Sequence, residues 1–200
     1  MIVYCATGNP GKLREFRLAG EAAGIRVETL PGLAEIPPCA ETGDTFEANA
    51  ALKAAYYGAH TAGLLFADDS GLEVDALGGA PGVYSARFAG PHATDEDNNR
   101  LLLERMRGVR DRTARFVCVI ALAEGGIVRA RFRHAVEGRI LEEARGPNGF
   151  GYDPLFYYEP FGCSFGEVAP ARKLTVSHRG GALRHLFHNL ASGTIKTKLP

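Results

Sequence analysis

"IVYCATGNPGKLREFRLAGEAAGIRVETL", residues 2–30, is the stretch that decides the fold class. It opens with a short apolar, β-prone run at residues 2–6, which is typical of a buried strand. Residues 7–11 form a turn, and a run of helical composition extends from residue 12 to about residue 23. A second β-prone run follows at residues 25–30. This strand–turn–helix–strand order predicts a βαβ-like unit and therefore an α/β fold.

The rest of the chain predicts a mixed sheet. Residues 114–140 hold two β-prone runs around Gly125-Gly126, a pattern that favours an antiparallel hairpin. An apolar strand is expected at residues 64–71, ending in two carboxylates. Capping residues and apolar periodicity predict further helices at residues 45–60, 93–108 and 177–191. We therefore expect a single domain over residues 1–200, or two closely joined lobes, with helices flanking the sheet.

Composition narrows the choice of partner. The 200 residues are 46% hydrophobic and 23% charged, and the formal net charge is zero. The charge balance argues against a general nucleic-acid or membrane-surface binder but is compatible with a small anionic ligand. The four cysteines show no C-x-x-C spacing, so we expect reduced, mostly buried thiols. No basic leader precedes the first apolar run, and no apolar stretch approaches ~18 residues, so we expect a cytoplasmic protein.

The turn at residues 7–12 resembles part of a phosphate-binding loop. A P-loop requires G-x-x-x-x-G-K-[ST], but Ala6 occupies the first glycine position and Leu13 the Ser/Thr position. A loop between a strand and a helix still offers backbone N–H groups to an anion, and Lys12 adds a positive charge. The alternative is a tight turn with a solvated lysine.

A pair of carboxylates, Asp68 and Asp69, lies at the end of the strand expected at residues 64–71. Neighbouring strand residues point to opposite faces, so one carboxylate can face a cleft while the other anchors a turn. Carboxylate oxygens of this kind are ligands for hard cations such as Mg²⁺. The alternative is a solvated Asx-type turn.

The helix expected after Glu41 carries a polar edge. Asn49 and Lys53 are four residues apart and share one helix face beside an apolar stripe. This arrangement suggests the polar rim of a pocket. An ordinary amphipathic helix with a lysine that extends to solvent is the alternative.

Two later segments offer groups that suit a flat base. In "GFGYDP", residues 149–154, glycines flank Phe150, while Tyr152 offers a second ring and Asp153 an acceptor. The alternative is a rigid turn packed by aromatic rings. In "KLTVSHRGGAL", residues 173–183, hydrogen-bond donors gather at or near the start of the last helix, which Ser177 would cap. These donors are Lys173, His178 and Arg179. The alternative is a capped helix with basic surface residues.

Five blocks in this order resemble the inosine/xanthosine triphosphate pyrophosphatase family. They are "TGNPGK" (7–12), "ETGDTFEANA" (41–50), "ADDSGLEVDALGGAPGVYSARF" (67–88), "GFGYDPLF" (149–156) and "SHRGGAL" (177–183). The resemblance covers essentially the whole chain. It implies a long, twisted mixed sheet in two lobes with the active site in the cleft between them. It also implies a Mg²⁺-dependent homodimer that hydrolyses ITP, dITP and XTP to the monophosphate and pyrophosphate.

The resemblance also assigns residues. Those that would hold the triphosphate are Thr7, Gly8, Asn9, Pro10, Gly11, Lys12 and Lys53. Asp69 would be the general base and, with Glu41, would hold Mg²⁺, while Asp68 is a possible third carboxylate. Ser70 would touch the substrate. The residues that would surround the base and sugar are Phe150, Gly151, Tyr152, Asp153, Lys173, His178 and Arg179.

Two positions depart from the family pattern. Ala40 stands where some relatives have a first glutamate, which leaves the metal role to Glu41, and Ala171-Arg172 replace the acidic residues that often precede the lysine. Two rival functions remain open at this point. One is a broad Mg²⁺-dependent nucleoside triphosphatase that releases orthophosphate, and the other is a non-catalytic nucleotide-binding protein.

Overall fold

The structure is a computed structural model that describes residues 1–195. The chain forms two compact units, each assembled from separate segments. Unit 1 comprises residues 1–69, 118–134 and those from 179 onward, and unit 2 comprises residues 70–117 and 135–178. The predicted domain of residues 1–200 thus extends over five residues, 196–200, that lie outside the described part.

The sheet is mixed, as predicted, and its seven strands follow the order β2-β1-β3-β4-β5-β6-β7. Strand β1 pairs in parallel with β2 and β3, whereas β6 pairs antiparallel with β5 and β7. The strands are β1 (Ile2–Cys5), β2 (Arg26–Thr29), β3 (Leu64–Val74), β4 (Thr113–Glu124), β5 (Ile127–Ile140), β6 (Phe156–Tyr158) and β7 (Cys163–Ser164). The predicted βαβ start and the β4–β5 hairpin are both present. The α/β fold with a mixed sheet is confirmed.

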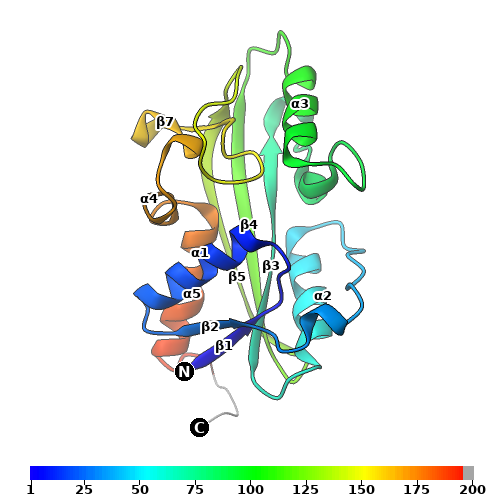
Figure 1. Ribbon diagram of the computed structural model, residues 1–200, viewed down its shortest axis with the longest axis vertical. Coiled ribbons are helices and arrows are strands. Elements are labelled where there is room, and N and C mark those ends of the chain that lie inside the picture. The colour runs from blue at the N-terminus through cyan, green and yellow to red at the C-terminus, as the bar shows by residue number, and fades with distance from the viewer. Residues whose placement is uncertain (196–200) are drawn as a thin grey trace. The chain divides into compact units, whose positions relative to one another are not determined.

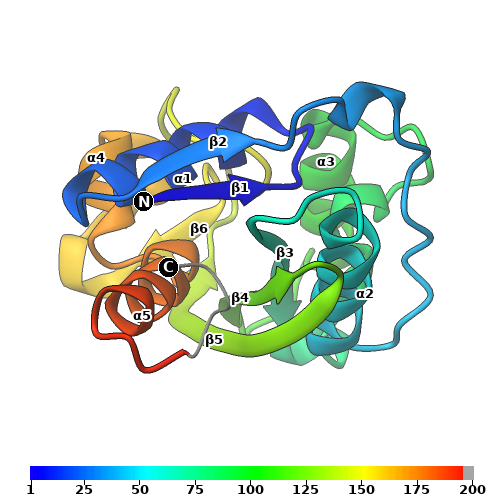
Figure 2. The same ribbon diagram turned by 90° about the horizontal axis from the view of Figure 1, so that it is seen from below.

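Unit 1 places helices on both sides of its strands. The helices are α1 (Pro10–Ala22), α2 (Phe46–Gly58) and α5 (His178–Ala191), of which α5 enters unit 1 at Arg179. Helices α2 and α5 lie on opposite sides of the strands (Figures 1 and 2). On the α5 side, the ring of Phe66 packs against Phe16 of α1 at 4.9 Å and Phe187 of α5 at 6.4 Å between ring centroids. Strand β3 therefore presents one face to α1 and α5 and the other to α2.

Unit 2 packs around an aromatic core. Phe116 of β4 lies 4.5 Å from Phe156 and 6.3 Å from Phe165 between ring centroids. Helix α3 (Asp95–Arg105) begins with a capping box between Thr94 and Asp97, as its cap and acidic first turn predict. The remaining short helices of the chain are α4 (Pro170–Leu174), η1 (Leu33–Glu35), η2 (Asp75–Leu77), η3 (Gly82–Arg87), η4 (Glu159–Phe161) and η5 (Phe165–Glu167).

One expectation about an element boundary is wrong. Strand β3 does not end at the carboxylates but continues to Val74, because Leu72 and Val74 are both fully buried and extend the apolar face. Lys173 lies near the start of the last helix, as expected, but belongs to a different helix. Pro170, at the first position of a helix, starts a separate short helix, α4, that carries Lys173. Over residues 1–195 the structure contains no helix with both the length and the apolarity needed to cross a bilayer.

Candidate active site

The predicted phosphate loop leads directly into helix α1. Asn9 caps this helix, since its side-chain oxygen accepts a hydrogen bond from the Lys12 N–H at 3.0 Å, and Pro10 occupies the first turn. The Thr7 hydroxyl accepts from the Asn9 N–H at 3.2 Å. A Cβ added at Gly8 would meet no atom within 4 Å, so this part of the loop has open space beside it. The loop therefore combines a capped helix N-terminus with an accessible backbone, a combination suited to an anion.

Lys12 extends from this loop to strand β3. Its ammonium lies 2.9 Å from the Asp68 carboxylate, which is buried, whereas the lysine side chain is 20% exposed. Burial alone would raise the pKa of Asp68, but the positive charges of Lys12, Arg179 and Lys53 outweigh it and hold that pKa well below its usual range. Asp68 is therefore ionised at neutral pH and keeps the Lys12 ammonium beside the loop.

On the opposite face of β3, Asp69 contacts helix α2. The Lys53 ammonium lies 2.8 Å from Asp69 Oδ1 and 3.4 Å from Glu41 Oε1. The Asn49 side-chain amide donates to Asp69 Oδ2 at 3.4 Å, and its oxygen accepts from the Gly43 N–H at 2.8 Å. Asn49 thereby ties the Glu41 loop to the Asp69 carboxylate. The structure brings together Glu41, Lys53 and Asp69, three residues far apart in the sequence.

Burial and charge act against each other in this cluster. Burial raises the pKa of Asp69 and outweighs the lowering effect of the Lys53 charge, and the nearby Glu41 raises that pKa further. Burial alone would lower the pKa of Lys53, but the carboxylates of Asp69, Asp68 and Glu41 outweigh it and raise that pKa. Lys53 is thus protonated at neutral pH, while the Asp69 carboxylate binds a proton more readily than an ordinary aspartate does. A carboxylate of this kind is suited to accept a proton.

The carboxylates of this cluster fit a hard cation. One positive group, the Lys53 ammonium, already lies within 3.4 Å of both Glu41 and Asp69 oxygens. Mg²⁺ is commonly held by one or two carboxylates together with substrate phosphates and water. The carboxylates of Glu41 and Asp69 therefore supply as many protein ligands as Mg²⁺ commonly has. In the described chain, no three His, Cys, Asp or Glu side chains form a metal-holding group by themselves. Asp68 forms ion pairs with Lys12 and Arg179 on the other face of β3, so its carboxylate does not lie with those of Glu41 and Asp69.

Glu15 belongs to the charged cluster around Asp68 and was not predicted from the sequence. Its carboxylate accepts from the Arg179 guanidinium at 2.6 Å, and Arg179 Nε lies 3.5 Å from Asp68. Both Glu15 and Arg179 are buried. The sequence signal that could have identified Glu15 is its position next to Phe16, on the face of α1 that packs inward. Arg179 was predicted to contact the base, and that role stays a prediction. In the structure its guanidinium pairs with two carboxylates, those of Glu15 and Asp68.

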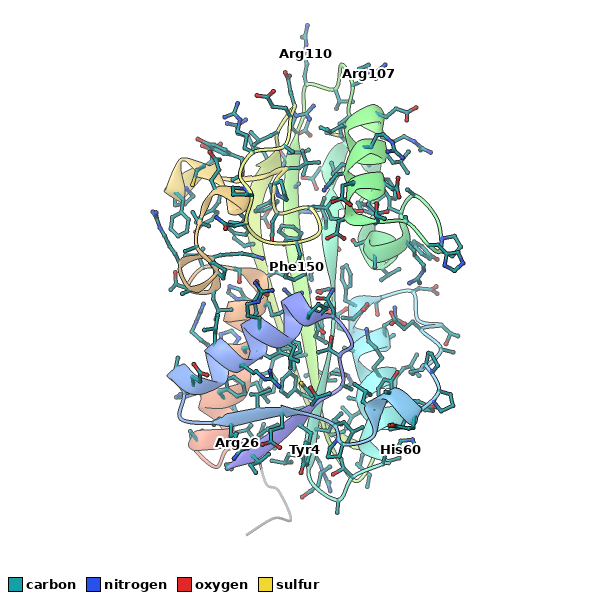
Figure 3. All side chains as sticks on the ribbon, in the orientation of Figure 1. Tyr4, Arg26, His60, Arg107, Arg110 and Phe150 are labelled. Atoms are coloured by element: carbon teal, nitrogen blue, oxygen red, sulfur yellow. The ribbon has the colours of Figure 1, made fainter. Side chains whose placement is uncertain are left out.

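In unit 2, the predicted base-binding loop is held by a buried ion pair. The Lys173 ammonium lies 2.6 Å from Asp153 Oδ2, and both residues are 2% exposed. The same carboxylate oxygen accepts from the Phe150 N–H at 2.9 Å, and the ammonium lies 4.8 Å from the centroid of the Phe150 ring. The structure therefore unites Phe150, Asp153 and Lys173. Figure 3 labels Phe150 in unit 2, well away from Arg107 and Arg110 of the same unit.

Other predicted base-binding side chains are packed in the core of unit 2. Tyr152 is 4% exposed and donates through its hydroxyl to the Ser85 carbonyl at 2.8 Å, so it does not offer the free ring face that was expected. The ring of His178 is stacked on Phe116, with centroids 4.7 Å apart. Ser70, the first residue of unit 2, is partly exposed. Tyr152 was misjudged because a tyrosine in a glycine-rich loop carries no sequence signal of its burial.

The fold and the site define a structural class, an α/β protein with a mixed sheet and lysine–carboxylate clusters on both faces of strand β3. Comparison with known proteins identifies the family. The chain belongs to the Ham1 family, whose model matches residues 3–189. It is 48% identical over 199 residues to a protein from Acidobacterium capsulatum named dITP/XTP pyrophosphatase, covering 95% of this chain and 98% of that protein. A protein of the same name from Thermus thermophilus is 49% identical over 195 residues, with 96% and 93% covered. The resemblance drawn from the sequence motifs is confirmed.

Solved structures agree with the fold. A HAM1 protein from Coxiella burnetii superposes with a TM-score of 0.86 at 38% identity, covering 96% of this chain and 99% of that one. The Ham1 protein of Staphylococcus aureus gives a TM-score of 0.85 at 36% identity over the same shares.

Proposed function

We propose that this protein hydrolyses non-canonical purine nucleoside triphosphates (ITP, dITP and XTP) to the nucleoside monophosphate and pyrophosphate. Such a reaction removes deaminated purines from the nucleotide pool. The observation that carries the proposal is the Lys53–Asp69 pair at 2.8 Å, with Glu41 on the same ammonium. The support from relatives is the name dITP/XTP pyrophosphatase, borne by proteins 48–49% identical over nearly the full chain.

The chemistry follows from charge placement. Asp69 orients a water molecule and takes its proton while the water oxygen attacks the α-phosphorus. The bond between the α-phosphorus and the oxygen that bridges to the β-phosphate breaks, and pyrophosphate leaves with the electron pair. Lys12, Lys53 and the N–H groups of the loop at residues 7–12 stabilise the negative charge on the phosphates. Glu41 and Asp69 would hold Mg²⁺, which supplies further neutralisation of the leaving pyrophosphate.

For base recognition we propose the cluster of unit 2. The Phe150 ring offers a stacking face. Lys173, whose ammonium also pairs with Asp153, would direct an N–H group to the 6-carbonyl that hypoxanthine and xanthine carry and adenine lacks. A mismatch between that N–H group and the amino group of adenine disfavours the wrong base, by up to about 10⁴-fold in favourable cases. His178 and Arg179 are proposed to contribute to the same readout. Guanine shares the 6-carbonyl, so its rejection needs a separate contact with the 2-amino group.

The test is turnover of ITP, dITP, XTP, ATP and GTP, each with Mg²⁺ and with excess chelator. We expect fast release of pyrophosphate from the first three substrates, slow release from ATP and GTP, and none in chelator. Equal rates with ATP would favour the broad triphosphatase. Binding of ITP with no turnover would favour the non-catalytic nucleotide-binding protein.

We also propose that the protein is a homodimer, as the family resemblance implies, and that it is cytoplasmic. Sedimentation velocity tests the first, with a species of twice the chain mass of 21.4 kDa as the expected result. Fractionation of cells that produce the protein tests the second.

A further inference from the structure

Both backbone groups of Gly151 are bound by side chains of one helix. The Gly151 N–H donates to Asp95 Oδ2 at 2.6 Å, and the Gly151 carbonyl accepts from the Asn99 side-chain amide at 3.0 Å. Asp95 and Asn99 are four residues apart on α3 and therefore lie on the same face of this helix. All three residues belong to unit 2.

These two hydrogen bonds determine the conformation of Gly151. Its N–H belongs to the peptide plane that joins Phe150 to Gly151, and its carbonyl belongs to the plane that joins Gly151 to Tyr152. Holding both planes fixes the two backbone dihedrals of the residue between them. Gly151 adopts a φ of 60°, and glycine is the residue with the greatest freedom to leave a given conformation. The contacts from α3 therefore restrict the backbone at one of the two glycines of the loop, Gly149 and Gly151.

Helix α3 is itself firmly anchored, so it can act as a reference for the loop. Its capping box joins Thr94 to Asp97, and the buried Asn98 binds the backbone at two points. The side-chain oxygen of Asn98 accepts from the Ala89 N–H at 2.9 Å, and its amide donates to the Ala86 carbonyl at 3.3 Å. Leu102 of the same helix is fully buried.

We propose that Asp95 and Asn99 are positioning residues that hold the Phe150–Gly151–Tyr152 backbone in the conformation that receives the purine base. This inference rests on the proposed function, because it assigns the loop of residues 149–153 to base binding. Asp153 orients Phe150 from within the loop, and α3 fixes the next residue from outside it. A loop ordered in advance loses less conformational entropy when the ligand binds, which improves affinity without a new ligand contact.

The effect belongs to binding and not to the chemical step. Asp69, Lys53 and Glu41 lie in unit 1 and make none of the Gly151 contacts. Loss of one hydrogen bond of ordinary strength should therefore raise the KM for ITP roughly three- to tenfold and leave kcat within about twofold.

The experiment combines hydrogen–deuterium exchange of the 147–155 peptide with ITP kinetics in Asp95→Ala and Asn99→Ala. Asp95→Asn keeps an acceptor oxygen and serves as the conservative variant. Glu96→Ala removes the neighbouring first-turn carboxylate of the same helix and serves as the matched control. We expect faster exchange and a higher KM in both alanine variants, partial recovery in Asp95→Asn, and wild-type values in Glu96→Ala.

Unchanged exchange in both alanine variants would overturn the inference, whatever the substrate proves to be. Faster exchange with an unchanged KM for ITP would also overturn it, since the loop would then be held for a reason other than base binding. If the wild-type protein did not hydrolyse ITP, the proposed function would fail, while the exchange data would still report whether α3 holds the loop.

Discussion

Burial and charge oppose each other at Asp69. Its carboxylate is 2.8 Å from a lysine ammonium, yet burial raises its pKa. We expect Asp69→Asn to lower kcat for ITP by ~10²–10⁴-fold, because the amide cannot accept a proton from water. Steady-state assays of pyrophosphate release measure this loss.

The control for that substitution is Asp111→Asn, which changes an exposed carboxylate of unit 2 in the same way. It should keep the wild-type kcat. Near wild-type turnover by Asp69→Asn would show that another group takes the proton.

The pH dependence follows from the direction of the same pKa shift. A general base must be ionised, so activity is present above its pKa and is lost as the pH falls through it. Because the pKa of Asp69 is raised from 3.8 in the metal-free protein, we expect its carboxylate to titrate above that value in ¹³C NMR spectra recorded without Mg²⁺. Titration at or below 3.8 would contradict a base of raised proton affinity at this position.

At the scale of elements, strand β3 shows what the sequence could and could not predict. The two-residue period of a strand correctly placed Asp68 and Asp69 on opposite faces. The end of the strand was misplaced, because "SGLEV" alternates small, polar and apolar residues without a clear stop. Extension to Val74 depends on packing, since Leu72 and Val74 are buried in the core of unit 2.

The candidate site, like strand β3, could be predicted from the sequence only in part. Lys12, Lys53, Glu41 and Asp69 were predicted together, because three of them belong to motifs of the family and Lys53 closely follows the motif that begins at Glu41. Their pairing was not predictable, since Lys53 and Asp69 are 16 residues apart and meet only when α2 packs on β3. Glu15 and the Gly151 contacts from α3 were missed for the same reason: they are tertiary contacts without a local pattern.

The loop of residues 149–153 depends on a glycine at position 149. Gly149 has a φ of 81°, and an added Cβ would lie 2.7 Å from Asp153 Cβ and overlap the carboxylate. We expect Gly149→Ala to displace Asp153 from Lys173 and Phe150, which should raise the KM for ITP and lower the free energy of unfolding. ITP kinetics and urea denaturation measure the two effects.

Gly78→Ala is the matched control, because Gly78 also has a positive φ, 63°, but no atom lies within 4 Å of an added Cβ. It should cost only the strain of the left-handed conformation, about 1–2 kcal/mol, and leave the KM unchanged. Equal effects of the two substitutions would mean that backbone strain, and not the Asp153 contact, controls the loop.

At the scale of the whole molecule, the reactivity of the four cysteine thiols tests which parts of the chain are buried. All four are free thiols, with Cys5 and Cys118 buried and Cys39 and Cys163 partly exposed. The expectation of mostly buried thiols thus holds for two of the four. Burial raises the pKa of both Cys5 and Cys118 to about 12, so their reactive thiolate is scarce at neutral pH.

We therefore expect iodoacetamide to label Cys39 and Cys163 in the native protein well before Cys5 and Cys118. Mass spectrometry of timed digests measures the order. Labelling in denaturant, where all four thiols should react, is the control. Native labelling of Cys118 as fast as Cys163 would contradict the placement of Cys118 within β4.

The central claim is that water attacks the α-phosphorus of a deaminated purine triphosphate. Hydrolysis of ITP in ¹⁸O-labelled water, followed by mass spectrometry of all products, tests it most directly. We expect one ¹⁸O atom in inosine monophosphate and unlabelled pyrophosphate. Label in pyrophosphate would mean attack at the β-phosphorus, and labelled orthophosphate would mean attack at the γ-phosphorus. Either result would contradict the proposed reaction.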